Sequence, residues 1–228
     1  MIDRSRPSAT FDVGPKRAML RFERLPATYI HPDRLSGCLP ANLPAKYRDR
    51  LLHAKRLRSR LSIVLTERFS LAPCVAEDLD TPEGRFARLE GTDLVEAIRR
   101  IGAMWHARTI AAIILADSVR ELIAWLGRDG YRSALRHVKR ASADVNNDVV
   151  GEKPNIELLC QMIERDGERC VHVWCEHQPA FLAERLLLKL PPMAEIDDPS
   201  LEQFQDQGLL TTDRVIMEIM ADDGNGSS

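Results

Sequence analysis

The stretch that decides the fold is DLVEAIRRIGAMWHARTIAAIIL, residues 93–115. Side chains that recur in it at intervals of four and three predict a buried helical stripe: Leu94, Ile98, Ile101, Trp105, Thr109 and Ala112. Residues 111–115 are apolar on every side, which favours a central helix. Asp93 and Glu96 have the spacing of a capping box, so the helix is expected to begin at Asp93.

Two residues inside this stretch interrupt its apolar character. Glycine costs ~1 kcal/mol relative to alanine in a helix, so Gly102 predicts the close approach of a neighbouring helix. A functional histidine needs an orienting or reacting partner. The nearest carboxylates to His106 in the sequence lie more than two turns away or on another face: Asp93, Glu96 and Asp117. His106 is therefore interpreted as a packing or hydrogen-bonding residue.

The flanking sequence predicts further helices separated by proline, glycine and polar loops. Pro26 and Pro32 exclude one continuous helix over residues 20–32, because each lacks an N–H and restricts the residue before it. Helices are expected over residues 45–69, 119–126, 131–140, 155–174, 181–190 and 212–220. Residues 169–175 also alternate as a strand does, but the helical interpretation is preferred.

These patterns predict a mainly α fold. A single irregular helical domain is expected over residues 19–192, between a flexible tail over residues 1–18 and an acidic, mostly disordered extension over residues 193–228. The chain has 228 residues, of which 44% are hydrophobic, and this is enough for a substantial core.

Several features bear on the cellular compartment. No run approaches the roughly 20 apolar residues of a membrane helix, and residues 1–20 lack the apolar region of a secretory signal. Five cysteines, an odd number, favour reduced thiols in a cytosolic protein over a disulfide framework. Any membrane attachment is therefore expected to come through another protein.

The sequence offers little catalytic or metal-binding chemistry. Cys170, His172, Cys175 and His177 lie within eight residues, but their spacing matches no standard zinc finger, so a partly buried helix is favoured over a zinc site. There is no phosphate-binding glycine loop, no G-x-S-x-G and no H-E-x-x-H. We therefore expect no catalytic residue, no cofactor and no metal ion, and interpret the chain as a non-enzyme.

Charge is balanced overall and polarised locally. The formal net charge is −2, but residues 46–60 contain seven lysines and arginines against one acid, whereas residues 193–228 contain nine acids against one arginine. The basic run could bind phosphates, bind an acidic protein face or simply be solvated. Apart from Tyr47, no aromatic residues interleave with it, which disfavours nucleic acid. The candidate protein-interaction residues are Lys55, Arg56, Arg58 and Arg60.

Three short motifs resemble those of the SctK/YscK family of cytosolic type III secretion proteins, in order and spacing over residues 20–191. The first comprises Phe22, Pro26, Ala27, Tyr29, Ile30 and His31. The second comprises Arg100, Ile101, Gly102 and His106. The third comprises Arg185, Leu186, Leu188, Lys189, Leu190 and Pro191. The basic run, the long N-terminal tail and the acidic extension depart from the family pattern.

The resemblance implies a mostly helical, non-enzymatic adaptor of the sorting platform at the base of the injectisome. It implies two partners, the cytoplasmic domain of the inner-membrane ring protein SctD and the platform protein SctQ, and a cytoplasmic location at the inner membrane without insertion. The alternative is a small regulatory or nucleic-acid-binding helical protein that uses residues 45–60.

Overall fold

The computed structural model describes residues 15–39, 43–44, 46–47, 50–51, 54–74, 77–141, 143–151, 154–192 and 201–225. Every regular element in these ranges is a helix, as the sequence predicted. The α-helices are α1 (Pro15–Arg24), α2 (Pro32–Cys38), α4 (Arg58–Arg68), α5 (Pro82–Arg88), α6 (Gly91–Trp105), α7 (Ala107–Ala112), α8 (Ala116–Leu126), α9 (Arg128–Arg136), α10 (Ile156–Glu176), α11 (Ala180–Lys189) and α12 (Leu201–Asn225). Four 3₁₀ turns join them: η1 (Pro26–Thr28), η2 (Lys55–Leu57), η3 (Glu77–Asp80) and η4 (Val138–Arg140).

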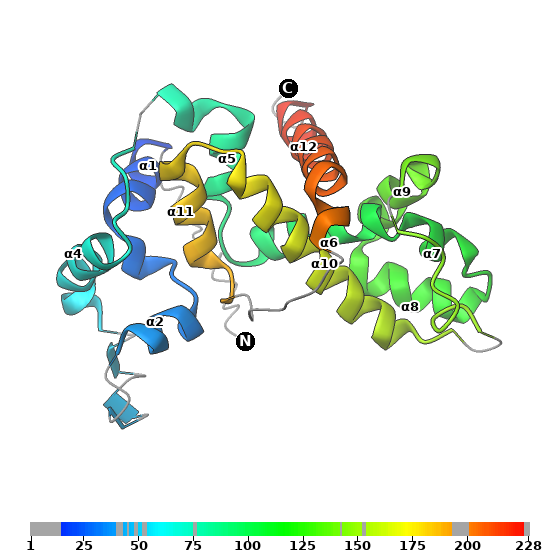
Figure 1. Cartoon of the computed structure of the whole chain (residues 1–228), viewed down its shortest axis with the longest axis horizontal. Helices are drawn as coiled ribbons and strands as arrows, with labels where there is room; N and C mark the ends of the chain where they lie inside the picture. The colour runs from blue at the N-terminus through cyan, green and yellow to red at the C-terminus, as the bar shows by residue number, and fades with distance from the viewer. Residues whose placement is uncertain are drawn as a thin grey trace, which may run out of the picture.

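The centre of the fold is the crossing of α6 and α10 (Figure 1). A Cβ atom added to Gly102 would lie 1.9 Å from the carbonyl oxygen of Ile163, and one added to Gly167 would lie 2.3 Å from that of Ile98. Only glycine on both helices permits this contact between backbones. The close approach predicted at Gly102 is therefore confirmed, and its partner is Gly167.

The α6–α10 pair separates two apolar clusters. One contains buried residues of α1, α5, α11 and α12 together with the C-terminal half of α10. In it, the rings of Trp174 and Phe86 pack edge to face with their centroids 5.4 Å apart. The other contains residues of α7, α8 and α9 with the N-terminal half of α10, among them Ile110, Leu122 and Leu159. Figure 1 shows α1, α5 and α11 on one side of the crossing of α6 and α10, and α7, α8 and α9 on the other.

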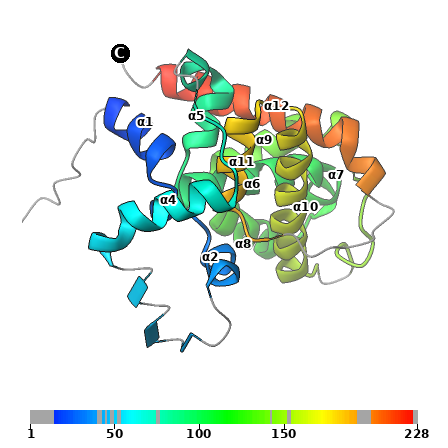
Figure 2. The ribbon, with the colours of Figure 1, turned by 60° about the vertical axis from the view of Figure 1, so that its left-hand side comes forward.

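A third cluster attaches α4 to the body. Leu65 of α4 is fully buried against Ile30, Leu35, Leu71 and Leu188. The helix packs mainly on η1, and it lies at the edge of the molecule, away from α6 and α10 (Figure 2). One side of α4 is thus covered by the body while the other side faces outward.

Proline residues set several boundaries as the sequence predicted, and the structure adds an asparagine cap. Pro26 opens η1 and Pro32 opens α2, so residues 20–32 contain no continuous helix. Asn155 caps α10 by accepting a hydrogen bond from the Leu158 N–H at 3.0 Å. Residues 169–175 lie within α10, which confirms the helical interpretation over the strand. Helix α11 ends at Lys189, just before Pro191.

The helix predicted over residues 45–69 is not continuous: residues 46–47 and 50–51 are helical, but a break separates them from α4. Ala54 is extended, with φ −77° and ψ 91°, and η2 separates it from α4, which begins only at Arg58. Several basic side chains follow one another here, and their mutual repulsion opposes a continuous helix. Parts of residues 45–53 lie outside the described residues.

The start and the end of the central helix also differ from prediction. Helix α6 begins at Gly91 after Glu90, and no side chain caps it, so Asp93 lies in the first turn instead of at the cap. The helix ends at Trp105, and the short α7 follows the turn at His106. Residues 113–115 leave the helix with an extended backbone, which puts successive side chains on opposite sides. Ile113 is therefore buried, whereas Ile114 is 88% exposed.

The C-terminal helix is longer than the one expected over residues 212–220. Helix α12 spans Leu201–Asn225 and lies across α10 and α6 (Figure 2), with Val215 and Ile216 buried. This part of the predicted extension therefore packs on the helical body. The expectations for residues 1–14, 193–200 and 226–228 lie outside the described residues. No helix in the described ranges has the length and apolar character needed to cross a membrane.

Candidate protein-interaction site

The first and third sequence motifs meet in space. The backbone N–H of His31 donates to the carbonyl oxygen of Leu188 at 2.7 Å. The guanidinium of Arg34 donates to the carbonyls of Leu190 at 2.7 Å and Pro191 at 3.3 Å. These bonds join the start of α2 to the end of α11, and they satisfy carbonyl groups that a helix end leaves unpaired.

Lys189 lies at the centre of this junction and is almost fully buried. Its Nζ donates to the carbonyls of Ala87 at 2.7 Å and Leu89 at 2.8 Å. The same nitrogen lies 5.0 Å from the ring centroid of Phe22 and 5.1 Å from that of Tyr29, within cation–π range. Burial lowers the pKa of Lys189 to about 7, because desolvation penalises the charged amine more than the nearby Glu90 carboxylate favours it.

Arg185 makes a second set of connections. Its Nη1 donates to the carbonyls of Ala72 at 2.7 Å and Phe181 at 3.1 Å, and its Nη2 donates to that of Glu23 at 3.3 Å. The segment after α4 and the end of α1 are thereby tied to α11. We refer to Phe22, Tyr29, His31, Arg185 and Lys189 as the motif cluster. Leu186, Leu188 and Leu190 are buried beneath it.

The motif cluster supports α4, the helix that contains the end of the basic run. The backbone N–H of Ala27, in the first motif, donates to the Ser62 hydroxyl of α4 at 3.3 Å. Tyr29 is held in turn by a hydrogen bond from its hydroxyl to the Phe22 carbonyl at 2.8 Å. The motif residues therefore position α4, and most of them are internal.

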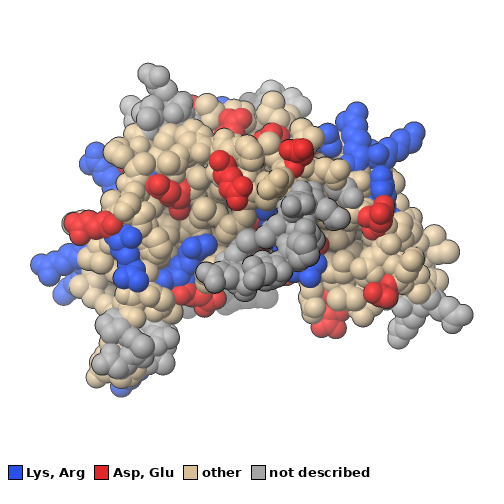
Figure 3. Space-filling model, viewed as in Figure 1, with Lys and Arg blue, Asp and Glu red and all other residues tan. Residues whose placement is uncertain are grey.

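The predicted interaction residues differ in accessibility. Lys55, Arg56 and Arg60 are exposed, whereas Arg58 is half-buried, and its Nε is buried without a hydrogen-bond partner among the described residues. Exposed apolar side chains lie beside the three exposed cations, with Leu57 at 38%, Ile63 at 60% and Val64 at 55% exposure. Figure 3 shows lysine and arginine side chains gathered at the edge of the molecule over α4. The apolar component of this surface was not anticipated from the sequence.

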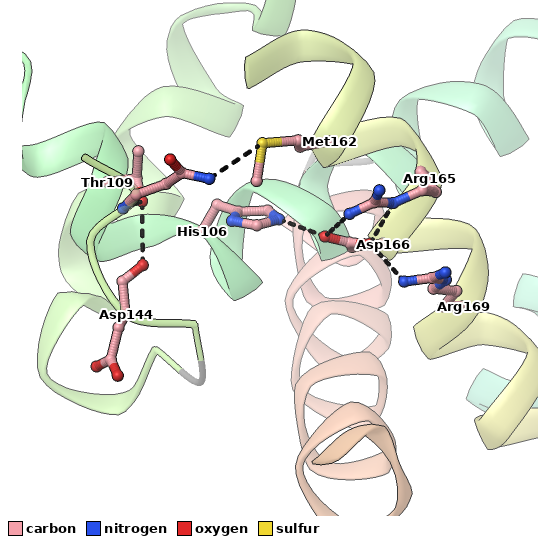
Figure 4. A network of polar contacts seen from close by, with 8 residues as sticks. His106, Thr109, Asp144, Met162, Arg165, Asp166 and Arg169 are labelled. Atoms are coloured by element: carbon pink, nitrogen blue, oxygen red, sulfur yellow. Dashed lines mark hydrogen bonds and ion pairs between the residues drawn. The ribbon is translucent and has the colours of Figure 1, made fainter. Parts of the chain in front are cut away.

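The second motif has a different, internal role (Figure 4). The Nε2 atom of His106 lies 2.7 Å from Oδ2 of Asp166 on α10, and both side chains are buried. Arg165 donates to the same carboxylate at 2.8 and 3.2 Å, and Arg169 donates to it at 3.4 Å. Burial alone raises the pKa of Asp166, but the hydrogen bonds from His106 and Arg165 outweigh it, and the pKa is lowered.

This network confirms that His106 is a hydrogen-bonding residue, but its partner was missed. Asp166 is 60 residues away in the sequence, and only its position beside Gly167 could have indicated that it faces α6. The loop after α9 is fixed nearby, because Thr109 donates to the Asp144 carbonyl at 3.3 Å and accepts from the Asn146 N–H at 3.1 Å. The arrangement fixes the bend between α6 and α7.

Of the four candidate zinc ligands, Cys170 and Cys175 are buried in α10 and His172 is half-buried, whereas His177 lies at the end of the helix and is exposed. Burial raises the pKa of Cys175 to about 12 and lowers that of His172 to about 4. Burial likewise raises the pKa of Cys170, so these thiols are protonated at neutral pH. Within the described ranges, no three histidine, cysteine or acidic side chains gather as a metal ion requires.

Acidic residues of α12 also accept hydrogen bonds from side chains of the helical body. The indole N–H of Trp174 donates to Asp213 at 2.7 Å, and Glu218 accepts from the Ser133 hydroxyl at 2.6 Å and lies 2.6 Å from His137 Nε2. Burial alone raises the pKa of Glu218, but these hydrogen bonds outweigh it and the pKa is lowered. The acidic composition of residues 193–228 thus partly reflects internal contacts.

Comparison with known proteins identifies relatives. Residues 18–217 match the family described as YOP proteins translocation protein K (YscK). The chain is 28% identical over 178 residues, 77% of each chain, to Nodulation protein NolU of Rhizobium fredii and, equally, to the protein of that name from Sinorhizobium fredii (strain NBRC 101917 / NGR234). No solved structure matches. Because the family match covers most of the sequence and all three motifs, the chain belongs to the YscK family.

Proposed function

We propose that this protein is a non-enzymatic adaptor of a type III secretion system that links the inner-membrane ring protein SctD to the sorting-platform protein SctQ. Membership of the YscK family points to a type III secretion component. The two partners and a cytoplasmic position at the base of the apparatus are our extension of that membership. The nodulation proteins that it resembles favour a symbiotic setting.

The observation that supports this function best is the outward face of α4. This face comprises three exposed cations and three exposed apolar side chains of η2 and α4, two consecutive elements. Protein interfaces combine such apolar residues with a charged rim. In the motif cluster and the His106–Asp166 network, His106 Nε2, Arg185 Nη1 and Lys189 Nζ bond to a neighbouring side chain or to the backbone, which suits a rigid scaffold.

The test is reconstitution of the three-protein assembly. Purified full-length chain is mixed with SctQ and with the cytoplasmic domain of SctD, and the mixture is separated by size-exclusion chromatography with light scattering. The proposal expects one species that contains all three proteins and no SctD–SctQ complex when the chain is omitted. Separate elution of SctD and SctQ in its presence would refute the link.

The nucleic-acid alternative can be tested with the same material. Phosphate binding depends on cations and falls steeply with salt, whereas exposed aliphatic side chains lie among the cations on this face: Leu57, Ile63 and Val64. We expect weak retention on heparin. Strong, salt-sensitive retention of the free chain would favour the alternative function instead.

A further inference from the structure

Helix α4 has apolar side chains on two sides, and the body covers only one of them. Leu65 is buried and Leu61 partly buried against the third apolar cluster. Ile63 and Val64 are exposed away from it, and Leu57, at the end of η2 about two turns earlier, is exposed as well. A helix that is apolar on both sides is usually covered on both sides. Its outward face therefore has the composition of an interface that no described part of the chain covers.

Charge is distributed unevenly along this face. Lys55, Arg56 and Arg60 are exposed at its N-terminal end without an acid, whereas Glu67 and Arg68 are both exposed near its C-terminal end. Positions 56, 60, 63 and 67 follow one another at helical spacing, so apolar and charged groups share one stripe. A partner must therefore offer an apolar stripe flanked by carboxylates opposite residues 55–60.

We infer that the outward face of α4 binds an acidic amphipathic helix of one partner protein, with Leu57, Ile63 and Val64 against its apolar stripe and Lys55, Arg56 and Arg60 against its carboxylates. This inference rests on the proposed adaptor function. A partner helix suits this surface because its apolar and acidic side chains can recur at the same spacing as the apolar and basic side chains of α4. The rim of cations steers the acidic partner and sets its orientation, and the aliphatic side chains supply the buried area.

Two other occupants fit this surface less well. An anionic membrane surface is bound by basic amphipathic helices with aromatic residues and many cations, but the outward face of α4 has aliphatic residues and the acidic Glu67. A second copy of the chain would have to offer an acidic helix, yet two acids of α12, Asp213 and Glu218, are already engaged internally. Both occupants are outcomes of the test below.

The experiment uses two independent double variants and two matched controls of the full-length chain. Arg56→Glu with Arg60→Glu reverses the charge, and Ile63→Ala with Val64→Ala removes the apolar contact while preserving helix propensity. Arg58 is left unchanged because it is half-buried. The controls change equally exposed residues elsewhere, Lys139→Glu with Arg140→Glu and Ile114→Ala with Leu115→Ala. Circular dichroism and thermal melting verify that each variant folds.

Affinity for SctQ and for the SctD domain is measured separately. We expect both α4 variants to bind one of the two partners at least about tenfold more weakly and the other within about twofold. Both controls should bind that first partner within about twofold of the unmodified chain. Binding of the affected partner should weaken with salt, and Arg56→Glu with Arg60→Glu should flatten this dependence. Folded α4 variants that bind both partners normally, or lose both, would overturn the inference.

The remaining outcomes separate this inference from the adaptor function. If the unmodified chain binds neither partner, the adaptor function has failed. The α4 inference is then tested with a synthetic helical peptide that has leucines along one face and glutamates on the flanking positions. Binding of that peptide to the unmodified chain but not to the α4 variants supports it, and equal or absent binding overturns it. If the unmodified chain sediments with phosphatidylglycerol vesicles and the α4 variants do not, the surface binds a membrane instead. If the unmodified chain is a dimer in light scattering and the α4 variants are monomers, the surface binds a second copy of the chain instead.

Discussion

The side-chain nitrogen of Lys189 lies 2.7 Å from the carbonyl oxygen of Ala87 and so joins the end of α11 to the end of α5. A neutral amine can donate to both carbonyls that it contacts, Ala87 and Leu89, without a buried charge. The same nitrogen lies against Phe22 and Tyr29. One buried lysine therefore connects three segments that are far apart in the sequence.

Lys189 is expected to make stability depend on pH above neutrality. Its folded pKa of about 7 is below the ordinary value of 10.5, so between these values the unfolded chain binds more protons and unfolding becomes less favourable as pH rises. The contribution is at most about 1.4 kcal/mol per pH unit. Urea unfolding from pH 7 to 8.5 should show this rise in the unmodified protein but not in Lys189→Met. An equal rise in both proteins would contradict the assignment.

The glycine contact between α6 and α10 should tolerate no side chain. Gly102→Ala would bring Cβ within 1.9 Å of the Ile163 carbonyl oxygen, and the helices would have to separate, at a cost of about 3 kcal/mol or more. Gly37→Ala is the matched control, because nothing lies within 4 Å of its added Cβ and alanine favours the helix by about 1 kcal/mol. Thermal melting should show a large loss for Gly102→Ala and none for Gly37→Ala.

The buried pair of His106 and Asp166 should be strongly coupled. Removing one partner leaves the other buried with incomplete hydrogen bonding, so His106→Ala is expected to cost about 3 kcal/mol. A double-mutant cycle with Asp166→Ala should give a coupling of about 1–3 kcal/mol. The exposed pair of Arg120 and Asp117 should give less than about 1 kcal/mol in the same cycle. Additive effects at His106 and Asp166 would argue against the pairing.

Attachment of α12 should depend on Glu218. Replacing it with alanine removes the acceptor for Ser133 and the partner of His137, with a cost of about 1–3 kcal/mol. Hydrogen exchange should accelerate in α12 and α9 more than in α8, because the lost contacts join the first two helices. Asp206→Ala, at an exposed position of α12, is the control and should leave exchange in α9 unchanged. Uniform acceleration through the chain would indicate global destabilisation instead.

The sequence by itself determined the helical class and many boundaries. Pro26, Pro32 and Pro191 stop or start helices wherever they occur, and Asn155 caps a helix with its own side chain, because these effects act within a few residues. Gly102 likewise indicated close helix packing, since a helical glycine that is retained at a cost usually has a packing reason. The three motifs were sufficient to indicate the family.

Only the tertiary structure decided which residues meet. The partners of Gly102 and His106 lie on α10, more than fifty residues away, and the carbonyls that Lys189 contacts lie about a hundred residues before it. The break at Ala54 and the exposed aliphatic face of α4 were also not predicted from the periodicity of the sequence. Apolar residues that face the body and apolar residues that face outward recur at the same helical spacing, so the spacing does not distinguish them. Helical periodicity is a local property, whereas burial and charge pairing depend on which elements the whole chain brings together.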